Sequence, residues 1–598
     1  MARRGTPRQA LATLAALFSA ALTVGCVSMP TGGPVQSYPV TLGAGAPNQP
    51  NVQFQPQKPR DGWLPQQIVQ GFLAASASFG NSQVALQYLT PQEQKTWTNP
   101  TSSAVIYKNG PNVANPVYPA TAKTAKTATV QVTGDIQATL EGSTYSVPST
   151  QAAKATDAPP PFKLVKGPDG QWRISSAPPQ VLLTSGSFAN DYQLRNLYFF
   201  DPTGRYLVPD PIYVPLSAGN LMNGLVQDLI TPPKDWLSGG ATKTALPAGT
   251  KLSDVTVVDS VTALVNLTGA IGKDGTNAAL LEQVSSQLLW TLSGSGQSGS
   301  TGAVQSVEVE LDGHPWFPPG SQGNPVQQKS QSQNVPPTGA SSVYYYLDGA
   351  GYLTSRQGTS GKTEQIEPLG TTYTQVAVSP SGRYLAALRD STLYAGPVGG
   401  PLEKQGSGFA AMSWDGNDNL WTALGGQVFM FRVAATIRQP LGRLVQVPVK
   451  VNSIYGTDLR IPFTALRVAP DGVRVALVDD GDVLEFGAIS GQQGQDPQIM
   501  LSQVQLSPPD NATGFTALTW YGPDNVITLA QPGPAATEYP VSGGTPTQIP
   551  VEPGMKTITA SSGNLLIAGM TGGSIVADNS LTGAWMNLGG GVAPAYPG

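Results

Sequence analysis

The chain has 598 residues, of which 40% are hydrophobic and only 12% charged, with 33 basic against 37 acidic side chains. This length fits roughly three to five domains, and the near balance of charge, without any basic stripe, argues against nucleic-acid binding. One histidine and one cysteine cannot supply a zinc site of the usual ligands, so we expect neither a metal nor a cofactor. The 68 glycines and 54 prolines favour β-rich domains joined by turns.

Residues 1–25 are typical of a secretory signal peptide. Three arginines among the first eight residues precede a largely apolar run over 10–24, which is the order of the n- and h-regions of such a signal. The run is shorter than the ~20 residues of a permanent transmembrane helix. Arg3-Arg4 also allows a twin-arginine signal, but no apolar pair follows it, which favours the general secretory route.

The apolar run ends in Leu22-Thr23-Val24-Gly25-Cys26, which resembles a lipobox. In that motif the cysteine thiolate takes a diacylglycerol group, and the small residue before it admits the signal peptidase. We therefore predict cleavage between Gly25 and Cys26, and an N-palmitoyl, S-diacylglycerol Cys26 that anchors the protein to the extracytoplasmic face of the cell membrane. Thr23 stands where leucine is commonest, a departure that the looser form of the motif tolerates. The alternative is an ordinary signal peptide that happens to contain a cysteine.

A lipidated flexible linker over 26–58, rich in Pro, Gly, Gln and Asn, precedes an expected α+β domain over 59–185. That domain begins with a helical apolar stripe at 65–73 and two further short helices, the last carrying Trp97. Alternating segments follow, with a hairpin turn and strand at 168–174. Helices followed by an antiparallel sheet resemble the NTF2-like cone, a likeness of fold that indicates no ligand.

A second domain over 190–315 shows the order strand, helix, two strands, helix, strand. The expected elements are a strand at 195–201 continuing at 207–209, a helix at 221–230, strands at 255–258 and 263–267, a helix at 280–292 and a strand at 304–311. With the Ala-Leu-Pro-x-Gly-Thr-x-Leu element at 245–252, this order resembles the GerMN domain of bacterial spore and cell-envelope proteins. The apolar stripes of its helices indicate core packing.

After a Pro-, Gly- and Gln-rich linker over 316–340, residues 341–598 repeat a strand, a turn containing glycine and an alternating strand. The clearest copies are at 376–388 and 466–478, and variants surround Trp414 and Trp520. Weaker copies lie near residues 346–353 and 558–567. Turn positions recur every ~35–55 residues, which is typical of β-propeller blades, and the region has room for about five or six of them.

Three tryptophans of this region, Trp414, Trp421 and Trp520, allow two interpretations. If they were exposed on one rim, they could stack on envelope glycans. Aromatic residues at repeated turn positions more commonly pack between blades, and we expect that here.

The candidate catalytic groups are few. His314 could complete a Ser-His-Asp triad, but its neighbours are turn residues, which favours a structural or solvated histidine. Asp479, Asp480 and Asp482 surround a tight turn, where solvated acids are more common than a hydrolase site or a calcium site. Because the sequence has no Gly-x-Ser-x-Gly elbow and no phosphate loop, we expect no catalytic residues and a binding protein, not an enzyme.

A lipobox, an NTF2-like segment, a GerMN domain and a C-terminal propeller, in this order, resemble the actinobacterial LpqB lipoprotein family. The resemblance covers essentially the whole mature chain and implies a multidomain fold, two α+β domains followed by an all-β propeller. It also implies a function as an accessory factor of the two-component system of sensor kinase MtrB and response regulator MtrA. The expected partner is the extracytoplasmic domain of that sensor histidine kinase, whose signalling in cell-envelope homeostasis and division the protein would modulate. The alternative function is binding of peptidoglycan or another cell-wall glycan.

Overall fold

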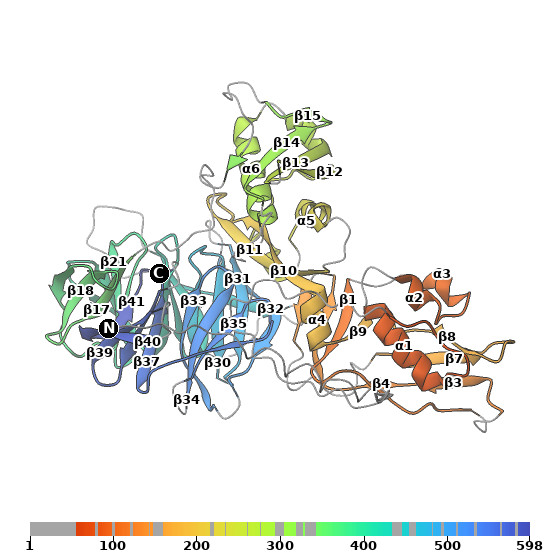
Figure 1. The fold of residues 1–598 in the computed structure, drawn as a ribbon. Helices are drawn as coiled ribbons and strands as arrows, with labels where there is room; N and C mark the ends of the chain where they lie inside the picture. The colour runs from red at the N-terminus through yellow and green to blue at the C-terminus, as the bar shows by residue number, and fades with distance from the viewer. Residues whose placement is uncertain are drawn as a thin grey trace, which may run out of the picture. The chain divides into compact units, whose positions relative to one another are not determined.

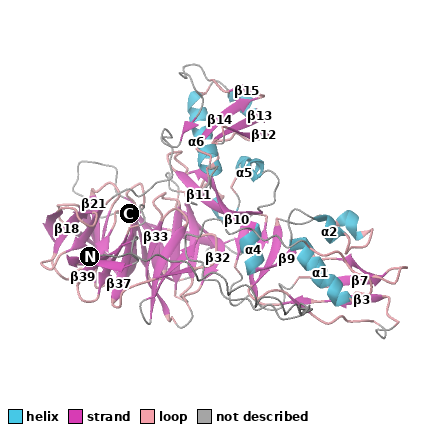
Figure 2. Ribbon diagram, viewed as in Figure 1, coloured by secondary structure: helices cyan, strands magenta, loops and turns pink. Residues whose placement is uncertain are grey.

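The computed structural model covers the chain with gaps. It describes residues 56–77, 82–97, 102–119, 124–142, 144–147, 159–215, 221–233, 235–259, 261–274, 277–293, 304–317, 327–328, 342–432, 445–453, 462–480, 482–491, 496–509, 512–531, 535–561, 565–579 and 584–598. Figure 2 shows that strands dominate these residues, and each helix that they form ends before residue 293. The predicted fold class, α+β domains followed by an all-β propeller, is therefore confirmed.

The first region mixes short helices with small sheets. Its elements are α1 Pro65–Ala77, α2 Ser82–Leu86, α3 Glu93–Thr96, β1 Ser103–Tyr107, β2 Asn112–Val113, β3 Thr127–Val130, β4 Val132–Thr133, β5 Ile136–Glu141, β6 Thr144–Ser146, β7 Phe162–Lys166, β8 Trp172–Ser176 and β9 Val181–Thr184. The strands form sheets of order β6-β5-β1-β9 and β3-β7-β8, and a β2-β4 pair (Figure 1). The turn at 168–174 joins β7 to β8 as predicted.

The helical stripe of the first region is confirmed, because the apolar positions of α1 are buried. Phe72 of α1 meets Phe162 of β7 edge to face, with ring centroids 5.8 Å apart. The predicted helix at Trp97 is a single turn: α3 ends at Thr96, and Trp97 caps it with an extended backbone. From that position Trp97 packs its ring 5.4 Å from Phe72.

A hairpin and an α+β unit follow. The elements are α4 Ser185–Asp191, β10 Tyr192–Phe200, β11 Leu207–Pro215, α5 Leu221–Ile230, η1 Asp235–Leu237, β12 Thr250–Val258, β13 Thr262–Gly269, η2 Ala270–Asp274, α6 Ala278–Leu292, β14 Ser306–Leu311, β15 His314–Pro315 and β16 Gln327–Gln328. The predicted order of strands and helices is confirmed, and α5 and α6 bury their apolar faces in one core with β12, β13 and β14. One detail differs: β10 and β11 are two nine-residue antiparallel strands that form a sheet of their own. The Asp201 carboxylate ends β10 by accepting hydrogen bonds from the N–H groups of Arg205 and Tyr206, both at 2.7 Å.

The remaining strands build a propeller. They are β17 Val343–Leu347, β18 Tyr352–Gln357, β19 Thr363–Pro368, β20 Gln375–Val378, β21 Tyr384–Arg389, β22 Thr392–Pro397, β23 Glu403–Ser407, β24 Phe409–Trp414, β25 Leu420–Leu424, β26 Gln427–Arg432, β27 Val445–Pro448, β28 Lys450–Ser453, β29 Phe463–Val468, β30 Arg474–Asp479, β31 Leu484–Ser490, β32 Gln498–Leu506, β33 Gly514–Tyr521, β34 Asn525–Gln531, β35 Ala535–Pro540, β36 Thr547–Ile549, β37 Met555–Ala560, β38 Leu566–Met570, β39 Ser574–Asn579, β40 Ala584–Gly590 and β41 Val592–Ala595. In the described part of this region they form six sheets of at least four strands, the upper of the two predicted blade numbers.

The first blade is composite. Its order is β19-β18-β17-β41, so the innermost strand comes from the C-terminal end of the region and the other three from its start. We number the blades from this sheet, with blades 2 to 6 beginning at β20, β24, β29, β33 and β37. Blade 4 also carries β28, which pairs in parallel with β32. The repeat at 346–353 therefore lies one strand farther from the centre than the other copies.

The repeated turns have a common chemistry. In blade 4, the Asp471 carboxylate accepts hydrogen bonds from the N–H groups of Val473 and Arg474, both at 2.9 Å. In blade 3, Asp415 accepts from Asn419 N–H at 2.9 Å in the same way. Gly472, the glycine of the blade 4 turn, has φ +70°, a conformation that glycine adopts without the cost of a Cβ. In the blades other than the first, the motif seen in the sequence thus marks the turn after the innermost strand.

Candidate functional site

The predicted lipidation site cannot be described in atomic terms. Gly25 and Cys26 lie outside the described residues. No helix among the residues placed by the structure is long and apolar enough to span a bilayer. The cleavage and acylation of this segment therefore remain predictions from sequence.

The remaining chemical candidates are separated from one another. His314 is exposed and pairs with Leu311 in the short β14–β15 hairpin. Asp479 caps the turn between β30 and β31 by accepting from Val483 N–H at 2.7 Å, and Asp482 there has φ +60°. Within the described ranges, no three His, Cys, Asp or Glu side chains cluster as metal ligands would.

The three propeller tryptophans are buried, so stacking of glycans on them is wrong and packing between blades is confirmed. Trp414 is 1% exposed and donates its indole N–H to the carbonyl of Ala377 in the preceding blade at 3.0 Å. Trp520 donates to the carbonyl of Arg467 in the same manner at 2.9 Å. Trp421 is fully buried in the core shared by blades 3 and 4.

The structure instead concentrates buried polar groups where the β10–β11 hairpin and η1 meet blades 4 and 5. Val208 of β11 and Trp236 of η1 share one buried apolar cluster with Val504 of β32 and Trp520 of β33. Charged and amide side chains are buried beside this cluster. We call this contact, together with the neighbouring β6 strand, the module junction.

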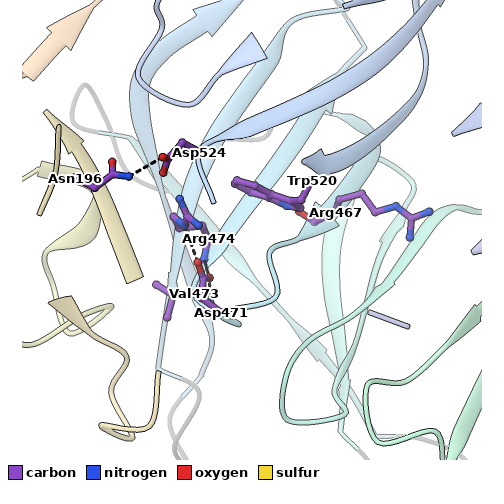
Figure 3. Close-up of polar contacts among 7 residues, drawn as sticks. All are labelled: Asn196, Arg467, Asp471, Val473, Arg474, Trp520 and Asp524. Carbon is purple, nitrogen blue, oxygen red and sulfur yellow. Dashed lines mark hydrogen bonds and ion pairs between the residues drawn. The ribbon is translucent and has the colours of Figure 1, made fainter. Parts of the chain in front are cut away.

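Two charged side chains of the propeller form the centre of the module junction (Figure 3). Arg474, the first residue of β30, forms an ion pair with Asp471, with Nε 2.7 Å from Oδ2, and both side chains are almost inaccessible to solvent. This is the one ion pair between residues that the structure describes. The Arg474 guanidinium also lies 5.0 Å from the ring centre of Trp520, a cation–π distance.

Asp524, in the turn between β33 and β34, connects this pair to the hairpin. Asn196 of β10 donates from Nδ2 to Asp524 Oδ2 at 2.6 Å (Figure 3). Asp524 Oδ1 and Arg474 Nη1 are buried without a hydrogen-bond partner among the described groups. Burial raises the pKa of the Asp524 carboxyl, while the Arg474 guanidinium and the bond from Asn196 act in the opposite direction.

The first region contacts the same side of the hairpin and the propeller. Tyr213 of β11 packs its ring 5.0 Å from Tyr145 of β6 and 4.9 Å from Phe188 of α4. Its hydroxyl lies 3.4 Å from Ser542 Oγ, which follows β35 in blade 5. Burial raises the pKa of both tyrosines. The module junction therefore joins three parts of the chain.

A cavity of about 270 Å³ opens at the module junction. Its walls come from the turn between β5 and β6, from β10 and β11, from the segment after α5, and from the β32 and post-β35 segments of the propeller. No sequence pattern predicted the module junction as a whole, because its residues are far apart in the chain: 328 positions separate Asn196 from Asp524.

Three family models match the chain in series. "Lipoprotein LpqB, N-terminal domain" matches residues 58–189, "Sporulation and spore germination", the Germane model, matches 196–316, and "Lipoprotein LpqB beta-propeller domain" matches 351–597. Curated relatives match over nearly their whole length. The "Lipoprotein LpqB" of Thermobifida fusca is 28% identical, and the alignment covers 97% of both chains. The chain belongs to the LpqB lipoprotein family.

Other members of the LpqB family show the same extent of similarity. The Streptomyces coelicolor protein is 26% identical over 100% of this chain and 99% of its own, and the Mycobacterium tuberculosis protein is 25% identical over 97% and 98%. Among solved structures, the β-propeller domain of Myceliophteria thermophila Cps50 aligns with 38% of the chain, at 12% identity and a TM-score of 0.28. At that score the alignment adds nothing to the fold assignment, which rests on the LpqB and Germane models and on the strand order. The resemblances to GerMN and to LpqB that the sequence suggested are confirmed.

Proposed function

We propose that this LpqB-family lipoprotein is anchored through Cys26 on the extracytoplasmic face of the membrane and binds the extracytoplasmic domain of an MtrB-like sensor kinase. By this binding it modulates the kinase's signalling in cell-envelope homeostasis and division. The match to LpqB lipoproteins over nearly the full length carries the proposal. In this role the protein acts by binding and not by catalysis.

The module junction supports a role in binding because it joins the hairpin, the first region and the propeller through buried groups. A body held together in this way presents its surfaces in a fixed arrangement. A lipid tether would keep that body close to membrane-embedded sensors, which raises the effective concentration and lets a weak contact be occupied. Modulation further requires that the protein bind one signalling state of the kinase more tightly than the other.

The anchor is tested with Cys26→Ala, using Ser28→Ala as a matched control. Mass spectrometry of the mature wild-type protein should find a diacylated N-terminal Cys26, and cell fractionation should place the protein in the membrane. The Cys26→Ala variant should leave the membrane fraction, and Ser28→Ala should not. An unmodified mature chain that starts elsewhere and is free in the medium would contradict the anchor.

The partner is tested by crosslinking in intact membranes, followed by mass spectrometry of what co-purifies. We expect peptides from the extracytoplasmic domain of the sensor kinase, and direct binding of that purified domain to the unlipidated protein. Cys26→Ala should bind the purified domain equally well but crosslink less in cells, because only tethering is lost. Recovery of cell-wall glycan without the kinase would overturn the proposal in favour of glycan binding. Burial of Trp414, Trp421 and Trp520 removes the residues on which that alternative depended.

A further inference from the structure

The innermost strands of the six blades carry positive charge only. They are β20, β24, β29, β33, β37 and β41, and none of these described strands contains aspartate or glutamate. Two cations stand among their otherwise uncharged side chains: Arg467 of β29 and Lys556 of β37. Because propeller blades surround a central channel, these strands place net positive charge around the axis of the ring.

The Arg467 guanidinium lies on the axis side of its own strand. Its Nη1 donates to Met412 O of blade 3 at 3.0 Å, and its Nε donates to Leu518 O of blade 5 at 3.4 Å. These carbonyls belong to the innermost strands on either side of β29, whereas the outer edge of β29 pairs with β30. A group that reaches both carbonyls must lie in front of β29, toward the axis. Figure 3 shows the Arg467 side chain extending away from the Asp471–Arg474 pair.

This guanidinium has no anionic partner among the described residues. Both of its acceptors are neutral carbonyls, and the one ion pair that the structure describes joins Arg474 to Asp471. The Arg467 Nη2 group donates to no acceptor within the described ranges. Protein surrounds the guanidinium, and this burial lowers its pKa. Arginine nevertheless stays charged in proteins, and a buried charge is stable only with a partner, so the group favours an anion.

A small anion has access to this guanidinium. Although protein surrounds Arg467, part of the surface of this residue stays accessible to solvent. The acids of the turns after β24 and β29 are engaged within those turns. Asp415 accepts from Asn419 N–H, and Asp471 accepts from Val473 N–H. These two carboxylates therefore stabilise their own turns.

Two tryptophans with the same hydrogen-bonding role show what the arginine adds. The indole of Trp414 donates to Ala377 O, and that of Trp520 donates to Arg467 O, both on innermost strands of the preceding blade. A neutral donor is therefore enough to satisfy such a carbonyl. A guanidinium adds a permanent charge and further N–H donors, in a planar fork that matches the oxygens of a phosphate.

We propose that the propeller binds a phosphate group at Arg467, on the axis side of β29, either as the free ion or as the end of a small monoester. The bonds to Met412 O and Leu518 O hold the guanidinium in place before the ligand arrives, which lowers the entropic cost of binding. Lys556 strengthens the attraction through the field around the axis, and two cations without an acid favour a dianion. The site is separate from the module junction and does not depend on the proposed kinase contact.

The experiment titrates the full mature protein with sodium phosphate in a phosphate-free buffer. Isothermal titration should give one site per chain, binding should weaken as sodium chloride increases, and saturation should raise the unfolding temperature. Glycerol 3-phosphate distinguishes the two sources of the ligand. If it binds as tightly as phosphate, the ligand is a monoester; if it binds much more weakly, the ligand is the free ion. Failure of both to bind at millimolar concentration would overturn the proposal.

Substitutions locate the site. Arg467→Gln keeps an amide donor but removes the charge, so it should lose about tenfold or more in phosphate affinity. Arg467→Lys restores a point charge and should recover part of that loss. Arg383→Gln, at an exposed arginine in the turn after β20, is the matched control and should bind as the wild type does. Lys556→Gln should lose less than Arg467→Gln, because it acts only through the field. Wild-type affinity in a folded Arg467→Gln protein, or a larger loss in Lys556→Gln, would reject the site.

A second measurement does not require any variant to fold. Tungstate has the tetrahedral shape of phosphate and scatters anomalously, so diffraction from wild-type crystals soaked in it locates the anion. We expect tungsten beside Arg467 Nη2. Tungstate bound on the outer surface as an adventitious ion only, or not bound at all, would contradict the proposal. Circular dichroism identifies variants that do not fold, and for those the diffraction result decides.

Discussion

The boundaries between blades and the module junction are both buried contacts, but they are built from different groups. Each of the six blade boundaries has a hydrogen bond between innermost strands or their direct continuations. In order from the boundary of blades 1 and 2, the donors and acceptors are Gly598 N–H to Val378 O, Trp414 indole to Ala377 O, Val468 N–H to Ser413 Oγ, Trp520 indole to Arg467 O, Ala560 N–H to Thr519 Oγ, and Tyr596 N–H to Thr559 Oγ. All of these groups are neutral, although the Arg467 guanidinium of blade 4 also donates to Met412 O of blade 3 at 3.0 Å and to Leu518 O of blade 5 at 3.4 Å.

The module junction instead depends on Asn196, Arg474, Asp471 and Asp524, three of which can carry charge. Buried charges are stable only with their partners, whereas neutral hydrogen bonds within an apolar contact tolerate changes of pH. We therefore expect the bonds listed at the blade boundaries to be less sensitive to pH than the module junction. Four substitutions test this difference, from the largest expected effect to the smallest.

Trp414→Ala should destabilise the propeller most. It removes a fully buried side chain and a bond between blades 2 and 3, at a cost of about 4 kcal/mol in the free energy of unfolding. Denaturant unfolding followed by far-ultraviolet circular dichroism measures this loss, which should be equal at pH 5 and pH 8. Trp585→Ala, on the outer strand β40, is the matched control and should cost much less. Equal costs for the two variants would mean that burial between blades contributes little.

Arg474→Met should cost about 3 kcal/mol at pH 8, because it leaves Asp471 and Asp524 buried without their cation. Burial raises the pKa of Asp524, so its carboxyl takes up a proton more readily in the folded protein. The loss in the variant should therefore shrink as the pH falls and the carboxylate is neutralised. Unfolding at pH 5 and pH 8, with Arg205→Met as a surface control, measures both effects. A cost that does not depend on pH would contradict the contrast between junction and blades.

Asn196→Leu should separate the hairpin from the propeller without weakening the ring of blades. It removes the donor to Asp524 Oδ2, and an unsatisfied buried carboxylate costs about 2 kcal/mol. Hydrogen exchange should accelerate in β10 and β11 but not at the blade boundary of Trp414. Faster exchange at both places would show that the two contacts unfold together.

Asp191→Asn should have the smallest effect, and its sign depends on pH. Burial raises the pKa of Asp191, at the end of α4 beside Tyr192, to about 6. A carboxyl whose pKa is raised by folding favours the folded state below its unfolded pKa near 4, and that contribution is lost as the pH rises through 6. The variant should thus be more stable than the wild type at pH 8, by about 1 kcal/mol after solvent screening, and lose that advantage near pH 4. Thermal unfolding of the variant and the wild type between pH 4 and pH 8 measures how this difference in stability changes with pH.

The sequence predicted the elements that depend on neighbours along the chain. The apolar spacing of α6 is local, since its core positions Val284, Leu288 and Leu292 lie about one helical turn apart. The blade turns are local in the same sense, because Asp471 bonds its own following N–H groups. Such patterns are visible in the amino-acid sequence alone, and they predicted the Germane and propeller regions.

The parts that the sequence did not predict are contacts between distant segments. Nothing near Asn196 or Asp524 indicates that they are hydrogen-bonded, and the cavity exists only when several elements have assembled. The tryptophans were ambiguous for a related reason: a side chain at a turn can face solvent or the next blade. The position of the neighbouring blade determines which of the two occurs. Here Trp520 faces that blade, and its indole N–H donates to the Arg467 carbonyl.

The composite first blade has a consequence for how the propeller is made. Because β41 supplies the innermost strand beside β17, the ring cannot close until residues 592–595 have been synthesised. Until then β17 has an open edge, and an open edge can pair with a strand of another molecule. A premature stop codon or a bulky fusion after β40 would therefore yield aggregation-prone protein. A chain that lacks β41 therefore cannot close the propeller.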